Sequence, residues 1–65
     1  MVTESQYARL QARILMDKGD HAEMREKYHY YTSALTWLCR ISKEEETVED
    51  AENKEFCLEM ANKYL

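Results

Sequence analysis

The first apolar positions of the chain recur at steps of three and four residues, the period of an amphipathic helix. They are Tyr7, Leu10 and Ile14, with Ala8, Ala12 and Leu15 beside them. Thr3 and Gln6 have the spacing of a capping box, in which each side chain bonds the backbone N–H of the other residue. The pattern predicts a helix that begins near Glu4 and ends at Lys18, where Gly19 fits a left-handed stop.

A second helix is predicted over residues 20–42, with Asp20 as its N-cap and Glu23 three residues later. The link between the two helices would then be only two or three residues, which makes them antiparallel. Two apolar seams run along the second helix: Met24, Tyr28, Tyr31, Leu35 and Leu38, and then Lys27, Tyr30, Ala34, Trp37 and Ile41. The two seams predict two packing partners, the first helix on one side and a third helix or a second subunit on the other.

The composition changes sharply over residues 42–53, which form the one plausible linker. A third helix can begin at Ser42 or at Thr47, since each has an acidic residue three positions later. It is expected to run to about Tyr64. Its apolar residues become denser toward the C-terminal end, so its first turn is expected to be loosely held and its end docked.

Length and composition limit the fold to a single domain over residues 1–65. The chain has 65 residues with one glycine and no proline, and 45% of its residues are hydrophobic and 34% charged. Residues that could form the tight turns of a β-sandwich or β-barrel are therefore scarce. We predict an all-α fold: an antiparallel helical hairpin with a long central helix and an acidic third helix. Because a chain this short builds a small core, a homo-oligomer is also expected, joined through the second helix.

Charge divides the chain into unlike parts. Residues 1–27 carry five basic and five acidic side chains, residues 28–43 two basic and no acidic ones, and residues 44–65 two basic and eight acidic ones. The net charge of −4 opposes direct binding to nucleic acid. The acidic segment 44–55 either imitates the phosphate spacing of DNA or is a solvated helix start, and the sequence leaves both open.

Motifs for catalysis, metal binding or cofactor binding are missing from the sequence. It contains no glycine-rich phosphate loop, no Cys-x-x-Cys and no His-Glu-x-x-His. Cys39 and Cys57 are expected to be free thiols, buried or half-buried, and His29 a surface residue. We therefore expect no enzyme activity, no metal and no cofactor. No apolar run is long enough for a membrane span, and the protein is expected in the cytoplasm.

Aromatic residues concentrate on the second predicted helix, which carries four of the seven. Tyrosine and tryptophan are enriched at binding hot spots because they bring large contact areas and a polar group. Tyr30 and Trp37 lie seven residues apart, two helical turns, and can enter one groove. We expect them to anchor a partner, with Arg40 at the rim and Tyr31 and His29 beside them. The alternative is that these rings only fill the core.

The stretch from Tyr31 to Arg40, Tyr-Thr-Ser-Ala-Leu-Thr-Trp-Leu-Cys-Arg, resembles the aromatic Leu-x-Trp-x-x-Arg helix of small phage-encoded helical-hairpin proteins. Those proteins include cyclic-nucleotide sponges that blunt CBASS immunity and helical inhibitors of host regulators. The resemblance implies an oligomer without enzyme activity that works by sequestration.

From these features we expect a non-enzymatic phage or mobile-element protein that binds and modulates a host protein through its aromatic helix face. Two alternatives stay open. One is a cyclic-nucleotide sponge, in which the Tyr/Trp helix stacks a base and Arg9, Arg13 or Arg40 holds phosphate. The other is a structural assembly component.

Overall fold

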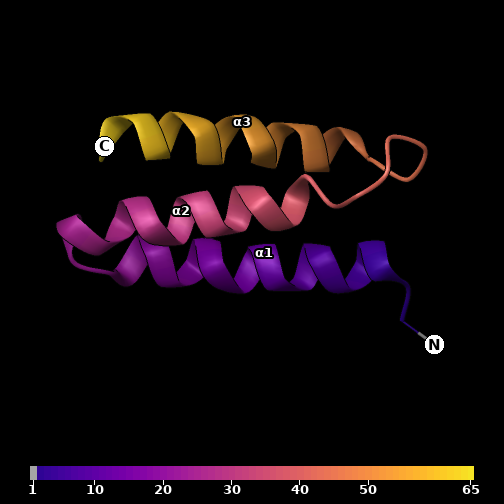
Figure 1. The fold of residues 1–65 in the computed structure, drawn as a ribbon, viewed down its shortest axis with the longest axis horizontal. Coiled ribbons are helices and arrows are strands. Elements are labelled where there is room, and N and C mark those ends of the chain that lie inside the picture. Colours follow the sequence, from indigo (N-terminus) through magenta and orange to yellow (C-terminus); the bar gives the residue numbers. More distant parts are fainter. Residues whose placement is uncertain (1) are drawn as a thin grey trace.

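The computed structural model describes residues 2–65 and contains three helices over that range: α1 (Glu4–His21), α2 (Met24–Leu38) and α3 (Val48–Lys63). The helices lie side by side with α2 between the other two, and α2 runs antiparallel to both (Figure 1). The molecule measures 35 × 20 × 14 Å along its principal axes. The prediction of an all-α fold with three helices is confirmed. The central helix is not long, however: α2 has 15 residues, against 18 in α1 and 16 in α3.

The capping box at the start of α1 is present as predicted. The Thr3 side chain accepts a hydrogen bond from the Gln6 N–H at 3.1 Å, and the Gln6 side chain accepts one from the Thr3 N–H at 3.0 Å. Two of the backbone groups at the helix start thus have local partners. Because this signal involves only neighbouring residues, it can be read directly from the sequence.

The predicted stop at Gly19 is wrong, because α1 continues through this residue to His21. Gly19 has no positive φ and is buried against α2. A Cβ atom there would lie 3.1 Å from Cζ of Tyr31 and 3.3 Å from Cβ of Tyr30. Glycine at this position therefore allows two helices to approach closely, and its left-handed conformations are not used.

Asp20 is not the N-cap of α2, which begins at Met24 after the short link Ala22–Glu23. The Asp20 carboxylate instead accepts a hydrogen bond from the phenol of Tyr31. The carbonyls of Gly19 and Asp20 accept from Nζ of Lys27, at 2.7 and 3.1 Å. The two-residue link is as short as predicted, but it begins three residues later along the chain.

Of the two possible starts for α3, the structure has the one at Thr47. Thr47 and Asp50 form a second capping box, and the helix ends at Lys63, close to the predicted end. The linker spans residues 39–47, so the prediction of a linker over 42–53 placed it too far along the chain. Ser42 organises this segment, since its carbonyl accepts from the N–H groups of Glu45 and Glu46 at 3.1 and 2.9 Å.

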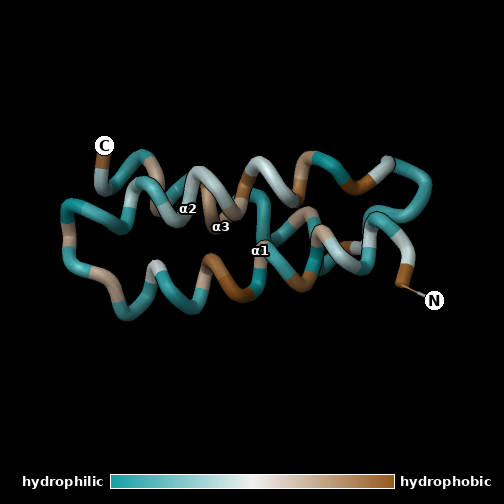
Figure 2. Tube along the Cα trace, turned by 60° about the horizontal axis from the view of Figure 1, so that its bottom comes forward, coloured by the Kyte–Doolittle hydropathy of each residue, from teal (hydrophilic) through white to brown (hydrophobic). Residues whose placement is uncertain are grey.

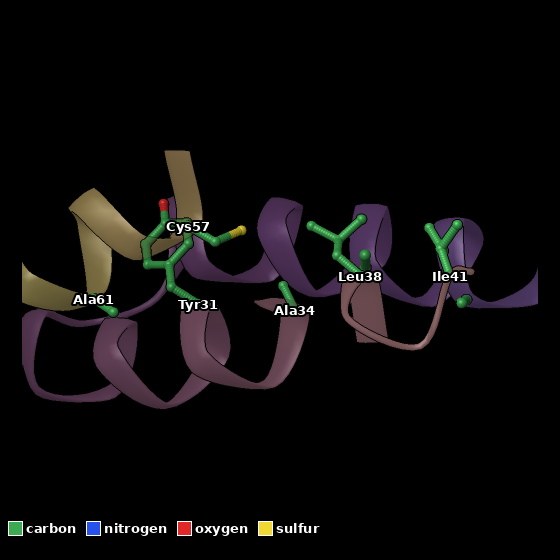
Figure 3. Close-up of a cluster of buried hydrophobic side chains, with 8 residues drawn as sticks. Tyr31, Ala34, Leu38, Ile41, Cys57 and Ala61 are labelled. Carbon is green, nitrogen blue, oxygen red and sulfur yellow. The ribbon is translucent and has the colours of Figure 1, made fainter. Parts of the chain in front are cut away.

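The core is narrow and built largely from alanine. Its buried apolar residues are Ala8 and Ala12 of α1, Tyr31, Ala34 and Leu38 of α2, Ile41 after α2, and Cys57 and Ala61 of α3. Figure 3 shows the Tyr31 ring rising from α2 toward Cys57, with Ala34, Leu38 and Ile41 following along the chain. Small residues allow the three helices to lie close together. They also leave few large side chains to supply the hydrophobic free energy of folding.

The two seams predicted on α2 mix in the core. Tyr31 and Leu38 come from the first seam, whereas Ala34 and Ile41 come from the second, and Met24 is 72% exposed. The two packing partners of α2 are α1 and α3 of the same chain. Figure 2 shows that hydrophobic residues occur in short stretches along all three helices.

An ion pair joins α1 to the start of α3, where a loose first turn was expected. Nε of Arg9 donates to both carboxylate oxygens of Asp50, at 3.0 and 2.9 Å, and Nη2 donates to the carbonyl of Glu45 at 2.6 Å. The Asp50 side chain is only 4% exposed. The half-buried Arg9 therefore holds the first turn of α3 firmly.

Candidate binding surface around Trp37

The outer face of α2 carries a shallow pocket of about 260 Å³ lined by Ser33, Thr36, Trp37 and Arg40. Ser33, Thr36 and Trp37 lie on one face of α2, and Arg40 follows in the turn just after the helix ends at Leu38. Thr36 Oγ1 donates to the carbonyl of Thr32 at 3.0 Å, so its lone pairs stay free to accept. The pocket thus combines an aromatic wall, two hydroxyls and one guanidinium.

Trp37 is held between two side chains. The Tyr7 ring of α1 meets it edge to face, with 5.5 Å between centroids and 77° between planes. The guanidinium carbon of Arg40 lies 4.8 Å from the centroid of the Trp37 ring. Tyr7 fixes the indole on the α1 side, and the cation–π contact fixes Arg40 beside it. Trp37 is half-buried, so part of the indole still faces solvent.

Arg40 has unused hydrogen-bonding capacity. A guanidinium has five N–H donors, yet Arg40 forms no ion pair with a carboxylate of residues 2–65. Its side chain is exposed and is already ordered by the Trp37 ring. An ordered cation without an acidic neighbour can accept a carboxylate from another molecule at a reduced entropic cost.

The other residues predicted to bind a partner lie in three different settings. His29 is exposed, and its ring centroid is 6.3 Å from that of Tyr30. Tyr30 is half-buried and passes over Gly19. Tyr31 has 0% exposure and cannot touch a partner while the helices stay packed. Burial, followed by the hydrogen bond to Asp20, raises the pKa of its phenol. Tyr31 is thus a core residue, and the binding prediction for it is wrong.

Tyr7 is a residue of this surface that the sequence reasoning missed. It is 47% exposed and belongs to α1, whereas the predicted anchors all lie on the second helix. The contact between Tyr7 and Trp37 spans 30 positions in the chain, so no local spacing reveals it. The antiparallel pairing of the first two helices was the one signal that could have brought them together.

A second pocket, of about 230 Å³, lies between α1 and α3 over Leu38. Its cations are Arg9 and Arg13, and its acids are Glu49 and Asp50. Arg9 is already bound to Asp50, and an anionic ligand would meet both carboxylates. Burial alone would raise the pKa of Asp50, but hydrogen bonds from Arg9 and Thr47 outweigh it and hold the pKa below its ordinary value. The carboxylate stays charged, and this pocket serves the fold.

Other chemical groups give no alternative centre within residues 2–65. No group of three or more His, Cys, Asp or Glu side chains there is placed to hold a metal ion. Cys57 is buried and free, and burial raises the pKa of its thiol to about 11. Cys39 is also free but is exposed, where a buried or half-buried thiol was expected. None of the described helices is long and apolar enough to cross a membrane.

Comparison of the chain with protein-family models, with curated proteins and with solved structures finds no match. What the surface around Trp37 can bind therefore follows from its own geometry and charge.

Proposed function

We propose that this chain is a non-enzymatic binding protein that attaches to a host protein through the face of α2 around Trp37 and modulates its activity. One observation carries the proposal: the Arg40 guanidinium is ordered over Trp37 beside two hydroxyls and pairs with no acid of residues 2–65. The resemblance of residues 31–40 to phage-encoded hairpin inhibitors supports a host target.

The chemistry of this surface also describes the segment it would bind. The indole offers an apolar contact, and Arg40 next to it offers a charge-assisted hydrogen bond. The best complement is a protein segment with an apolar side chain one helical turn from an Asp or Glu. Ser33 and Thr36 can then bond the polar backbone or side-chain groups of that segment.

A cyclic nucleotide fits this geometry less well. Arg40 already covers one face of the Trp37 ring, where a base would stack. Arg9, one of the candidate phosphate ligands, is bound to Asp50 on another side of α1. Stacking a base would require Arg40 to leave the indole, and the arginine would then lose its cation–π contact.

Site-specific photocrosslinking in a bacterial lysate tests the proposal. A photoreactive residue replaces Thr36 in the pocket, and a matched probe replaces Asn62, which is exposed on α3. We expect an adduct from position 36 only, reduced at least about tenfold by Arg40→Glu or Trp37→Ala. Equal adducts from both positions, or an adduct unchanged in folded Trp37→Ala, would contradict the proposal. An adduct only with a second copy of the chain would favour a structural assembly role.

A further inference from the structure

The outer face of α1 carries an apolar stripe that stays largely exposed, although Tyr7 at one end also contacts Trp37. Tyr7, Leu10 and Ile14 are 47%, 52% and 39% exposed. Together with Asp17 they follow steps of three, four and three residues, the spacing of a seam between two helices. The buried residues of α1, which include Ala8 and Ala12, lie on its other side.

The stripe is complementary to itself in the antiparallel direction. Its positions are symmetric about residue 12: Leu10 mirrors Ile14, and Tyr7 mirrors Asp17. When two α1 helices pair antiparallel about that point, each Leu10 faces Ile14 of the other copy. Each Tyr7 phenol then faces an Asp17 carboxylate, to which it can donate a hydrogen bond. A two-fold axis makes every one of these contacts twice.

Charges beside the stripe match in the same arrangement. Glu4 and Lys18 lie on one flank of α1, both exposed, and the antiparallel register brings each Glu4 within two residues, about 3 Å along the axis, of the other copy's Lys18. On the opposite flank Arg13 approaches Arg13 of the other copy. The repulsion between these two cations is offset by Asp17, which lies one helical turn from Arg13. In a parallel two-fold pair each flank would face the opposite flank of the other copy, so Glu4 would not meet Lys18 and this charge match would be lost.

We propose that the occupant of this stripe is a second copy of the same chain, in a two-fold antiparallel dimer joined through α1. The dimer forms through α1 and not through α2, whose two sides α1 and α3 of the same chain already cover. Three of the four residues that line the Trp37 pocket belong to α2, and the fourth, Arg40, is the second residue after it. The dimer would therefore carry two copies of that pocket, and it could bind a partner with repeated sites more tightly.

Two leucines of nearly equal exposure provide the test. Leu10 is 52% exposed on α1 and Leu58 is 51% exposed on α3. Sedimentation equilibrium over a wide dilution series should show a monomer–dimer equilibrium for the wild type and for Leu58→Asp. Leu10→Asp should weaken dimerisation at least about tenfold while circular dichroism stays helical. A wild type that is monomeric throughout, or equal effects of both substitutions, would overturn the proposal.

Charge reversal tests the direction of pairing. Lys18→Glu alone should weaken the dimer, because it places Glu4 against a new acid. The double variant Glu4→Lys/Lys18→Glu should restore dimerisation to near the wild-type level. Failure of the double variant to recover, at unchanged melting temperature, would overturn the antiparallel geometry. The proposed binding function is tested separately, by crosslinking from position 36 in the Leu10→Asp variant, so that loss of the dimer and loss of binding can be told apart.

Discussion

The two ends of the molecule are held together by different forces. At the turn end, where α1 passes into α2, a fully buried Tyr31 lies against Gly19 and meets Phe56 of α3 edge to face, with 5.8 Å between ring centroids. At the loop end, where α2 leads into α3, the central contact is the ion pair between Arg9 and Asp50. Close packing thus dominates one end, and charge dominates the other.

The difference follows from what the chain offers at each end. The loop end lies beside the acidic run, which begins at Glu44, and its buried apolar side chains are few, chiefly Leu38 and Ile41. A guanidinium that reaches three acceptors replaces the missing apolar contacts. At the turn end the helices are held together by the close packing of their side chains, whereas at the loop end they are held together by charged groups. The two ends should therefore respond to different perturbations.

Removal of the Tyr31 ring should have the largest effect. Tyr31→Ala leaves a cavity among all three helices, and truncation of a buried aromatic ring costs about 3–5 kcal/mol. A core of this size rarely supplies more than that, so the variant should be largely unfolded at 25 °C by circular dichroism. Tyr31→Phe is the control: it keeps the ring and loses the hydrogen bond to Asp20, which costs about 1 kcal/mol. A cooperative wild-type melt of Tyr31→Ala would refute the packing account.

Removal of the charge at the loop end should cost less and should depend on pH. Asp50→Asn keeps the size of the side chain but weakens the bonds from Arg9, at roughly 1–2 kcal/mol at pH 7. Because the folded pKa of Asp50 lies below the unfolded value, its stabilising effect is present above the unfolded pKa, about 4. It is lost as pH falls through the folded pKa.

Urea unfolding of both proteins between pH 7 and pH 2 tests this dependence. The difference in unfolding free energy between wild type and Asp50→Asn should be largest near pH 7 and shrink toward zero in acid. Gly19→Ala, at the turn end, alters no ionisable group or its partner and should show a nearly constant difference over the same range. A constant difference for Asp50→Asn would mean that the charge of this residue contributes nothing to the fold.

The two ends also differ in how far the sequence predicts them. The caps at Thr3 and Thr47 are local patterns over four residues, and both were readable. The bond between Arg9 and Asp50 spans 41 positions, and helical periodicity gives no sign of it. The prediction for Gly19 was wrong because glycine is favoured both at a turn and at a close contact between helices. Only the position of Tyr31 in the folded structure distinguishes these two roles.

The candidate site divides in the same way. Trp37 and Arg40 are three residues apart, so the helix predicted over residues 20–42 placed them on one face in advance, although Arg40 lies in the turn just after α2. Whether Tyr30 or its neighbour Tyr31 is buried depends on where α1 and α3 pack against α2. That is a property of the tertiary structure, and the two overlapping seams gave no basis for choosing between the tyrosines.

Gly19→Ala should give the smallest effect. It tests whether glycine is needed at the turn end for close packing of the helices or only for its backbone flexibility. In an open helix this substitution stabilises by up to about 1 kcal/mol, because alanine is the better helix former. Here the new methyl group would lie 3.1 Å from Cζ of Tyr31, whose ring is fully buried and whose phenol is bonded to Asp20. The ring cannot move aside, and overpacking costs about 1–3 kcal/mol. We expect a net loss of about 1 kcal/mol, visible as a fall of several degrees in melting temperature.

Asn62→Ala, at an exposed helical position, is the control and should change the melting temperature little. A rise in melting temperature for Gly19→Ala would show that the helices have room to separate here and that the turn end is not fixed by close packing.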